Sequence, residues 1–372
     1  MLKEGLRIEE EMKLLLAILM ISIFFITTEY SSAGTGAREF SGCLPLQVGQ
    51  YRPFAETLDE GLQSALERAL DKNRSWRALI EQNKMAVGVV DLSNPATARF
   101  ASVNGWTMMY AASLPKIAVL LAAYRGIEDG ALQETPELHE WLVQMIRRSS
   151  NPAASSLIDL IGLKRIEDIL QWYQFYVPEY GGGIWLGARY AHGGERNPEP
   201  IKGLTHAATV MQICRFYYML ATGEIISPER SRQMLEILSR PGLHDKFVSV
   251  LEKHVSPDRL FRKSGDWDVY FSDSVLVWDE DCRKYILAAL IDDKDGERIL
   301  RDLVPVVEEL LKPSQIEASS RQQTKAPPRQ VSQSGLKRSS PSILCSACSA
   351  ILQGFHEFMR YSPFYPKDVK CR

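Results

Sequence analysis

Residues 113–124 read SLPKIAVLLAAY: a serine three positions before a lysine, followed by an almost unbroken apolar run. An apolar run of this length without a polar face predicts a helix that is buried on all sides. Pro115 fits the first turn of such a helix, where its missing N–H leaves no bond unmade. Side chains three residues apart lie on one face of a helix, so Lys116 is expected to reach the Ser113 hydroxyl.

Strand-like runs lie on both sides of this helix in the chain. Apolar segments precede it at 85–92 and 97–103, and three more strand-like segments follow it. The sequence therefore predicts an α+β fold, an antiparallel sheet built from both chain ends and covered by helices, with a helical subdomain. The later strands are expected at 260–264, 270–278 and 285–291, and the other helices from Thr57 and at 139–148, 151–163, 205–220, 227–238 and 296–311, with Pro305 kinking the last.

The composition argues against several classes of function. The 372 residues are 45% hydrophobic and 24% charged, as in ordinary globular proteins, and the formal net charge of -2 argues against a nucleic-acid partner. The six histidines show no zinc-ligand spacing, and Cys345 and Cys348 lack two well-spaced further ligands. Neither a metal nor a cofactor is therefore expected. No G-x-S-x-G motif occurs, which argues against an α/β-hydrolase.

The two ends of the chain differ from its middle. The apolar run at 14–25 has the length of a signal-peptide core, and Met12-Lys13 directly before it is a better start than the acidic residues upstream. We expect a signal peptide at 1–33, a linker at 34–53, the catalytic domain at 54–312 and a polar, disordered tail at 313–372. The protein is then an exported monomer, periplasmic or extracellular, that meets a membrane only through its export signal.

Three short motifs occur in a fixed order along the domain. They are Ser113-Leu114-Pro115-Lys116, Ser149-Ser150-Asn151 and Lys263-Ser264-Gly265. Each alone is weak, because S-x-x-K recurs at Ser334–Lys337 and S-x-N at Ser102–Asn104. Their context makes the set specific: the first opens the apolar helix, the second lies between two helices, and the third ends a strand.

This set resembles the serine β-lactamases and penicillin-binding enzymes, and the class A β-lactamases most, from about residue 55 to 311. The chemistry also follows from the residues. A serine hydroxyl needs a base at neutral pH, and the Lys116 amine can serve if the nearby cation Lys263 lowers its pKa. A serine at a helix N-terminus also lies beside free backbone N–H groups.

The resemblance implies roles for the other motif residues. Ser149 would relay a proton to the leaving nitrogen, and Asn151 would bind the amide of the substrate side chain. Lys263 and Ser264, of the Lys263-Ser264-Gly265 motif, would bind the substrate carboxylate. The oxyanion would lie between the backbone N–H groups of Ser113 and Asp266.

The residue that would activate water to release the acyl group is the one that the sequence identifies least clearly. Class A β-lactamases use a loop glutamate to activate water, and here that loop should fall within 176–204. Glu195 is the best candidate, with Glu179 and Glu199 as alternatives. Without such a base the acyl-enzyme would be long-lived.

Three functions therefore stay open. The first is a β-lactamase that hydrolyses β-lactam antibiotics through a Ser113 acyl-enzyme and so confers resistance. The second is a D-alanyl-D-alanine peptidase or penicillin-binding protein acting on cell-wall peptides. The third is a non-catalytic binding domain of the same fold.

Overall fold

The structure is a computed structural model that describes residues 44–47, 49–191, 193–279 and 283–312. The expected signal peptide, including Met12, and the expected tail at 313–372 lie outside the described residues. Part of the expected linker is described: Leu44 and Leu46 are buried, and the Leu46 N–H donates to the Ala221 carbonyl oxygen at 2.7 Å. These residues therefore pack on the domain.

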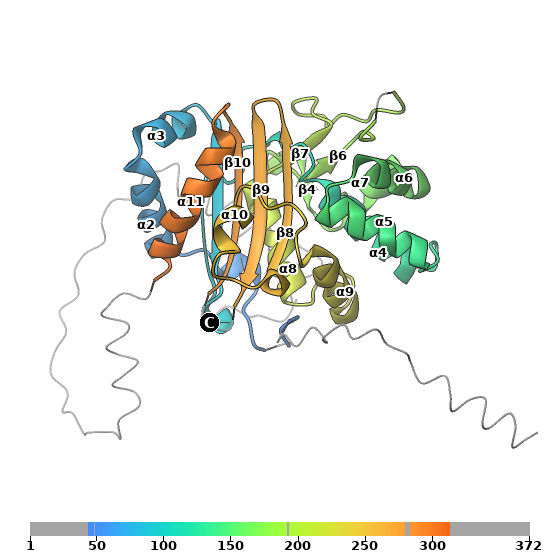
Figure 1. Cartoon of the computed structure of the whole chain (residues 1–372), viewed down its shortest axis with the longest axis horizontal. Coiled ribbons are helices and arrows are strands. Elements are labelled where there is room, and N and C mark those ends of the chain that lie inside the picture. Colours follow the sequence, from blue (N-terminus) through green and yellow to red (C-terminus); the bar gives the residue numbers. More distant parts are fainter. Residues whose placement is uncertain (1–43, 48, 192, 280–282, 313–372) are drawn as a thin grey trace, which may run out of the picture. The chain divides into compact units, whose positions relative to one another are not determined.

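A five-stranded antiparallel sheet forms the centre of the domain, in the order β2-β1-β10-β9-β8 (Figure 1). The first strand along the chain pairs with the last, from Met85 opposite Ile291 to Asp91 opposite Tyr285. The prediction of one sheet built from both chain ends is thereby confirmed, and β8 lies at one edge. The strands are β1 (Met85–Asp91), β2 (Arg99–Val103), β8 (Leu260–Trp267), β9 (Tyr270–Trp278) and β10 (Lys284–Asp292).

One face of the sheet is covered by helices from the two ends of the domain (Figure 1). Leucines at helical spacing in the first of them, Leu62, Leu66 and Leu70, are buried in one core with Leu300 and Leu303 of the last. These helices are α2 (Glu60–Asp71), α3 (Arg74–Glu81), α10 (Val248–Leu251) and α11 (Gly296–Leu310).

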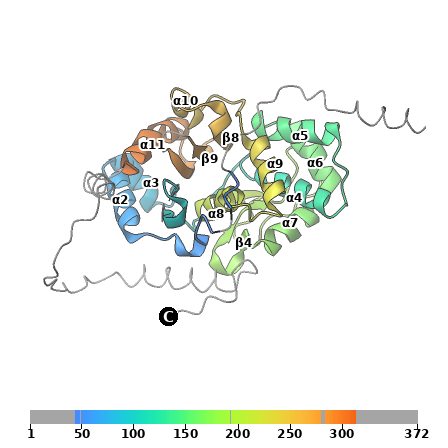
Figure 2. The same ribbon diagram turned by 90° about the horizontal axis from the view of Figure 1, so that it is seen from below.

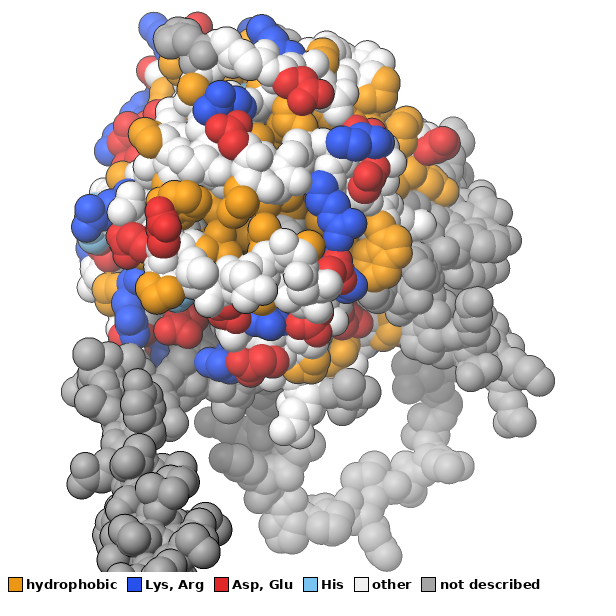
Figure 3. Space-filling view, turned by 90° about the vertical axis from the view of Figure 1, so that its right-hand side faces the viewer, with side chains coloured by type: hydrophobic (Ala, Val, Ile, Leu, Met, Phe, Trp, Pro, Cys, Tyr) orange, Lys and Arg blue, Asp and Glu red, His pale blue; other side chains and the backbone are white. Residues whose placement is uncertain are grey.

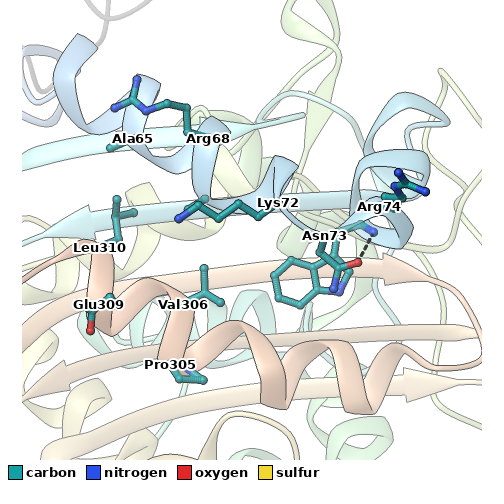
Figure 4. Close-up of a pocket in the computed structure, with 11 residues that line it drawn as sticks. Ala65, Arg68, Lys72, Asn73, Arg74, Pro305, Val306, Glu309 and Leu310 are labelled. Carbon is teal, nitrogen blue, oxygen red and sulfur yellow. Dashed lines mark hydrogen bonds between the residues drawn. The ribbon is translucent and has the colours of Figure 1, made fainter.

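An open hollow of about 860 Å³ lies between α2, α3 and α11. Figure 4 shows Lys72 extending along it and Val306 and Leu310 on its opposite side. Its lining includes none of the residues that the three sequence motifs single out. The hollow is thus separate from the predicted active site.

The other face of the sheet carries a thicker helical layer (Figure 2). Helix α8 (Val210–Ala221) packs against β1 and β10, and all of its 12 residues are buried. Beyond it lie α4 (Lys116–Glu128), α5 (Pro136–Arg147), α6 (Asn151–Ile161), α7 (Leu163–Trp172) and α9 (Pro228–Leu238). Within the part of the chain that the structure describes, no helix is both long and apolar enough to span a membrane.

Short elements connect these layers. A three-stranded sheet has the order β3-β7-β6, and β4 pairs with β5. On the face shown in Figure 3, basic and acidic side chains are interspersed among the described residues, around an area of hydrophobic side chains. The short strands are β3 (Met109–Tyr110), β4 (Tyr176–Val177), β5 (Gly182–Gly183), β6 (Trp185–Leu186) and β7 (His206–Ala208), and the 3-10 helices are η1 (Phe54–Glu56), η2 (Pro95–Thr97), η3 (Pro178–Tyr180) and η4 (Pro257–Arg259).

Several element boundaries differ from the sequence prediction for local reasons. The first helix begins at Glu60 and not Thr57, because Asp59 is its cap and accepts from the Leu62 N–H at 2.6 Å. The helix predicted at 205–220 begins later, at Val210, because Thr209 caps α8 and the residues before Thr209 form β7. Helices α3, α7 and α10 have no counterpart in the sequence prediction.

A core substitution tests the packing of α2 on the sheet. Leu66→Ala should lower the free energy of unfolding by about 2–5 kcal/mol, because Leu66 is fully buried and its truncation leaves a cavity. The matched control is Leu160→Ala in α6, where the leucine is 51% exposed and the change should cost about 0.5 kcal/mol or less. Urea unfolding measures both, and similar losses for the two variants would contradict this packing.

Candidate active site

Ser113 lies in a turn before α4 and not in its first turn. Residues 112–115 form turns, Ala112 has a positive φ of 48°, and the Lys116 N–H donates to the Ser113 carbonyl oxygen at 3.2 Å. The prediction that Ser113 opens the helix is therefore wrong by three residues. The Ser113 N–H has no hydrogen-bond acceptor among the described residues, as an oxyanion donor requires.

Strand β8 lies against this turn through a glycine. A Cβ atom at Gly265 would lie 2.5 Å from both the Ser113 nitrogen and the Ala111 carbonyl oxygen. The Ser272 hydroxyl of β9 lies between the two backbones, with its oxygen 2.9 Å from the Ala111 carbonyl oxygen and 3.2 Å from the Gly265 carbonyl oxygen. Glycine is therefore required for β8 to approach the turn so closely. Asp266 is the next residue of the strand.

Lys116 extends from the start of α4 to the connection between α5 and α6. Its Nζ donates to the Ser149 carbonyl oxygen at 2.6 Å and to Asn151 Oδ1 at 2.7 Å, and lies 3.4 Å from Ser149 Oγ. The backbone turns sharply here, because Ser149 has a φ of 54° and the Ser150 hydroxyl caps α6. Two of the three sequence motifs therefore meet at Lys116.

Lys263 joins the third motif to the same point. Its Nζ donates to Ser149 Oγ at 2.9 Å and to the Ser264 carbonyl oxygen at 2.5 Å. The Ser149 hydroxyl thus lies between two lysine side chains that both come from buried residues. Sequence reasoning named all of these residues, and the structure brings them together.

The two lysines have strongly altered acidities. Burial lowers the pKa of Lys116 to about 7, although the Asp266 carboxylate acts in the opposite direction. Burial lowers the pKa of Lys263 well below its usual range, and the charges of Lys116 and Arg262 lower it further. Burial therefore disfavours the charged form of both lysines.

Ion pairs support the strand that carries Lys263. The Arg262 guanidinium contacts Asp273 at 2.8 Å and Asp245 at 2.6 Å. Lys246 contacts Asp245 at 2.8 Å and the Asp266 carboxylate at 2.6 Å. Carboxylates thus pair with both Arg262 and Lys246, and the Asp266 side chain is held by Lys246.

One loop glutamate has a structural role. Glu199 is buried and accepts hydrogen bonds from the Tyr176 hydroxyl at 3.0 Å and from the N–H groups of Ile201, Lys202 and Leu204 at 2.7, 2.6 and 3.1 Å. These contacts use both carboxylate oxygens to hold the loop. Glu199 is therefore not free to activate water.

The other two glutamates lie at the surface. Glu195 and Glu179 are exposed, and neither has a hydrogen bond or ion pair with another described residue. In the described part of the chain, no contact joins either of them to Lys116, Ser149 or Asn151. The predicted role of Glu195 stays a prediction.

Tyr190 is the residue at this site that the sequence did not identify. Its hydroxyl donates to the Ala112 carbonyl oxygen at 3.1 Å, and its ring centroid lies 4.3 Å from Lys116 Nζ. The same ring packs on His206, with centroids 4.4 Å apart. The loop at 176–204 has no periodicity, so no sequence pattern distinguishes this aromatic residue from its neighbours.

Metal chemistry has no support from the described residues. Among them, His, Cys, Asp and Glu side chains form no group of three that could hold a metal ion. Cys214 has a free, buried thiol, whereas Cys345 and Cys348 lie outside the described residues.

Burial lowers the pKa of His206 to about 4, so its ring is neutral above that pH.

Comparisons with known proteins identify the fold. Residues 133–304 match the β-lactamase enzyme family. The structure is similar to that of PBP-A, with 19% identity, a TM-score of 0.50 and coverage of 72% of this chain and 98% of that chain. It is also similar to a class A β-lactamase from Bacteroides cellulosilyticus DSM 14838, with 17% identity, a TM-score of 0.51 and coverage of 67% and 98%.

A third similar structure is a class A β-lactamase representing the last common ancestor of Gram-negative bacteria, in a mutant form bound to 5(6)-nitrobenzotriazole. It has 16% identity and a TM-score of 0.51, and the match covers 65% of this chain and 98% of that chain. No curated protein matches the sequence. The predicted resemblance and the β-lactamase/transpeptidase-like α+β fold are both confirmed.

The close approach of β8 to the Ser113 turn gives a direct test. Gly265→Ala should lower the free energy of unfolding by about 1–3 kcal/mol, because the atoms in the way are backbone atoms that cannot turn aside. Gly61→Ala in α2 is the control, since its Cβ would meet only the Asp59 side chain at 3.3 Å and alanine favours a helix. Urea unfolding measures the free energy of unfolding of both variants. A Gly265→Ala protein as stable as the parent would contradict the contact.

Proposed function

We propose that this chain, which has the β-lactamase fold and matches the β-lactamase enzyme family, is a serine hydrolase that opens β-lactam or related amide bonds through an acyl-enzyme on Ser113. The observation that carries the proposal is the Ser149 hydroxyl between the Lys116 and Lys263 amino groups. A lysine that loses its proton near pH 7 can accept one from a serine hydroxyl.

The hydrogen bonds of Lys116 suit a base. A neutral amine has two N–H groups and one lone pair, and the Ser149 carbonyl oxygen and Asn151 Oδ1 accept from the two N–H groups. The lone pair is then left for the Ser113 hydroxyl. In acylation, Lys116 takes the Ser113 proton while Ser113 Oγ bonds to the carbonyl carbon of the substrate.

The next step transfers that proton to the leaving group. The C–N bond of the substrate breaks, its nitrogen takes the proton of the Ser149 hydroxyl, and Lys116 returns its extra proton to Ser149. The 3.4 Å separation of Lys116 Nζ and Ser149 Oγ is close to hydrogen-bonding range for this return. The Ser113 and Asp266 N–H groups are the proposed donors to the oxyanion.

The remaining motif residues are assigned to binding. Lys263 and Ser264 would bind the carboxylate of the substrate, whose negative charge offsets the repulsion between the two lysines. Asn151 would bind the substrate side-chain amide through its own amide. No cofactor enters these steps. Substrates of this kind lie outside the cytoplasmic membrane, which agrees with the export expected from residues 1–33.

A second candidate function is favoured by the positions of the loop glutamates. Glu199 is engaged in its own loop, and Glu195 and Glu179 are exposed. A site without a base for water forms an acyl-enzyme but releases it slowly. This arrangement favours a D-alanyl-D-alanine peptidase or penicillin-binding protein over an efficient β-lactamase.

Covalent labelling tests the nucleophile. Ser113→Ala should abolish labelling by a fluorescent penicillin, because no hydroxyl remains to form the ester. The matched control is Ser334→Ala, which removes the serine of the other S-x-x-K sequence and should leave labelling unchanged. Gel fluorescence of the purified full chain measures both. Persistent labelling of Ser113→Ala would place the nucleophile elsewhere, and an unlabelled parent would favour a binding domain.

The lifetime of the adduct separates the two enzymatic functions. After benzylpenicillin is added, we expect an adduct that persists in intact-mass spectra, and Glu195→Gln should change its lifetime less than about twofold. Removal of a true general base costs about 10²–10⁴-fold. Rapid turnover in the parent that Glu195→Gln slows by such a factor, while Glu179→Gln does not, would identify a β-lactamase with Glu195 as its base.

A further inference from the structure

Tyr190 connects the two groups that the proposed acylation uses. It lies in the loop between β6 and β7, and its hydroxyl donates to the carbonyl oxygen of Ala112, the residue before Ser113. Lys116 Nζ lies over this ring, 4.3 Å from its centroid, within the distance at which an aromatic ring attracts an ammonium group. One side chain therefore contacts both the turn of the nucleophile and the proposed base.

The hydroxyl contact stabilises an unfavourable backbone conformation. Ala112 has a φ of 48°, which is uncommon for a residue with a side chain and costs free energy unless its surroundings hold it. The Tyr190 hydroxyl binds the carbonyl of this residue, and the Ala111 N–H binds the His206 carbonyl oxygen at 2.8 Å. Together these bonds hold the backbone directly before Ser113.

The ring contact acts on the charged form of Lys116. The titratable groups that face Lys116 are Lys263 and Asp266 from β8, His206 from β7, and Tyr190 itself. Burial disfavours the Lys116 ammonium and Asp266 favours it, while the His206 ring is neutral above about pH 4. The Tyr190 ring favours the ammonium, because the negative face of the aromatic ring attracts a cation.

Tyr190 does not serve as the acid or base. Burial raises its pKa well above the usual range, and its proton is directed to the Ala112 carbonyl oxygen. The phenol therefore stays protonated at the pH at which Lys116 titrates. Tyr190 can therefore act only by holding Lys116 and the turn of Ser113 in place.

We propose that Tyr190 is a positioning residue for acylation, whose ring stabilises the ammonium that Lys116 becomes and whose hydroxyl fixes the turn that carries Ser113. This inference rests on the proposed function. Lys116 gains its positive charge as Ser113 attacks, so a ring that favours this charge lowers the barrier to acylation.

The two contacts can be separated by two substitutions. Tyr190→Phe keeps the ring and removes the hydroxyl bond, so the pKa of Lys116 should stay within about 0.3 units and acylation should slow by about 2–10-fold. Tyr190→Met fills the space with an apolar chain that has no aromatic face. The pKa of Lys116 should then fall by roughly 0.5–1.5 units, and acylation should slow by more than 10-fold.

The pKa of Lys116 is measured on the full chain labelled with ¹³C-lysine by NMR titration, and Lys116→Arg identifies its signal. Acylation is followed in parallel with a fluorescent penicillin. Tyr51→Met is the control for loss of a tyrosine ring, since that ring packs on Tyr218 and should leave Lys116 unchanged.

The outcomes test the ring contact and the proposed function separately. A Lys116 pKa that is unchanged or raised in Tyr190→Met overturns the inference, as does a Tyr190→Phe variant that matches Tyr190→Met in both readouts. A fall in the Lys116 pKa in a protein that no penicillin acylates would support the ring contact and overturn the proposed function instead.

Discussion

The site depends on one hydroxyl group, that of Ser149, held between two lysine side chains. It accepts from Lys263 at 2.9 Å and lies 3.4 Å from Lys116 Nζ, so it joins three segments that are distant in the sequence. Burying two ammonium groups side by side is unfavourable unless one gives up its proton. The fold tolerates the pair because carbonyl and amide oxygens bind both nitrogens. The same burial lowers the pKa of Lys116 to about 7, which is the property that a base for Ser113 needs.

The rest of the domain keeps these three segments in contact. The sheet places β8 at its edge, next to the turn of Ser113, and Gly265 is the residue without a Cβ that allows the approach. On the other side of β8, the buried Arg262–Asp273 ion pair fixes the strand in register with β9. The buried helix α4 carries Lys116, and the α5–α6 connection supplies Ser149. A change to any of these elements therefore reaches the reacting groups through the backbone.

Most of the fold and most of the site could be predicted from the sequence. The strands are apolar runs that contain β-branched or aromatic residues. The order of the three motifs singled out Ser113, Lys116, Ser149, Asn151 and Lys263 together. Features set by tertiary contacts could not be predicted. The start of α4 three residues after Ser113 depends on the left-handed Ala112, which is held by bonds from distant segments. Tyr190 and the engaged carboxylate of Glu199 lie in a loop without periodicity, so only the structure distinguishes them from Glu195.

The central claim is that Lys116 acts as a neutral base beside a second buried lysine. The most direct measurement is the rate of acylation of the unmodified chain by a penicillin between about pH 5 and 9. Because burial lowers the pKa of Lys116 to about 7, its amine is protonated below that pH and free above it. A neutral Lys116 base therefore gives an acylation rate that rises tenfold per pH unit below about pH 7 and then levels off. A rate that is independent of pH across this range, or that falls as the pH rises through 7, would contradict it.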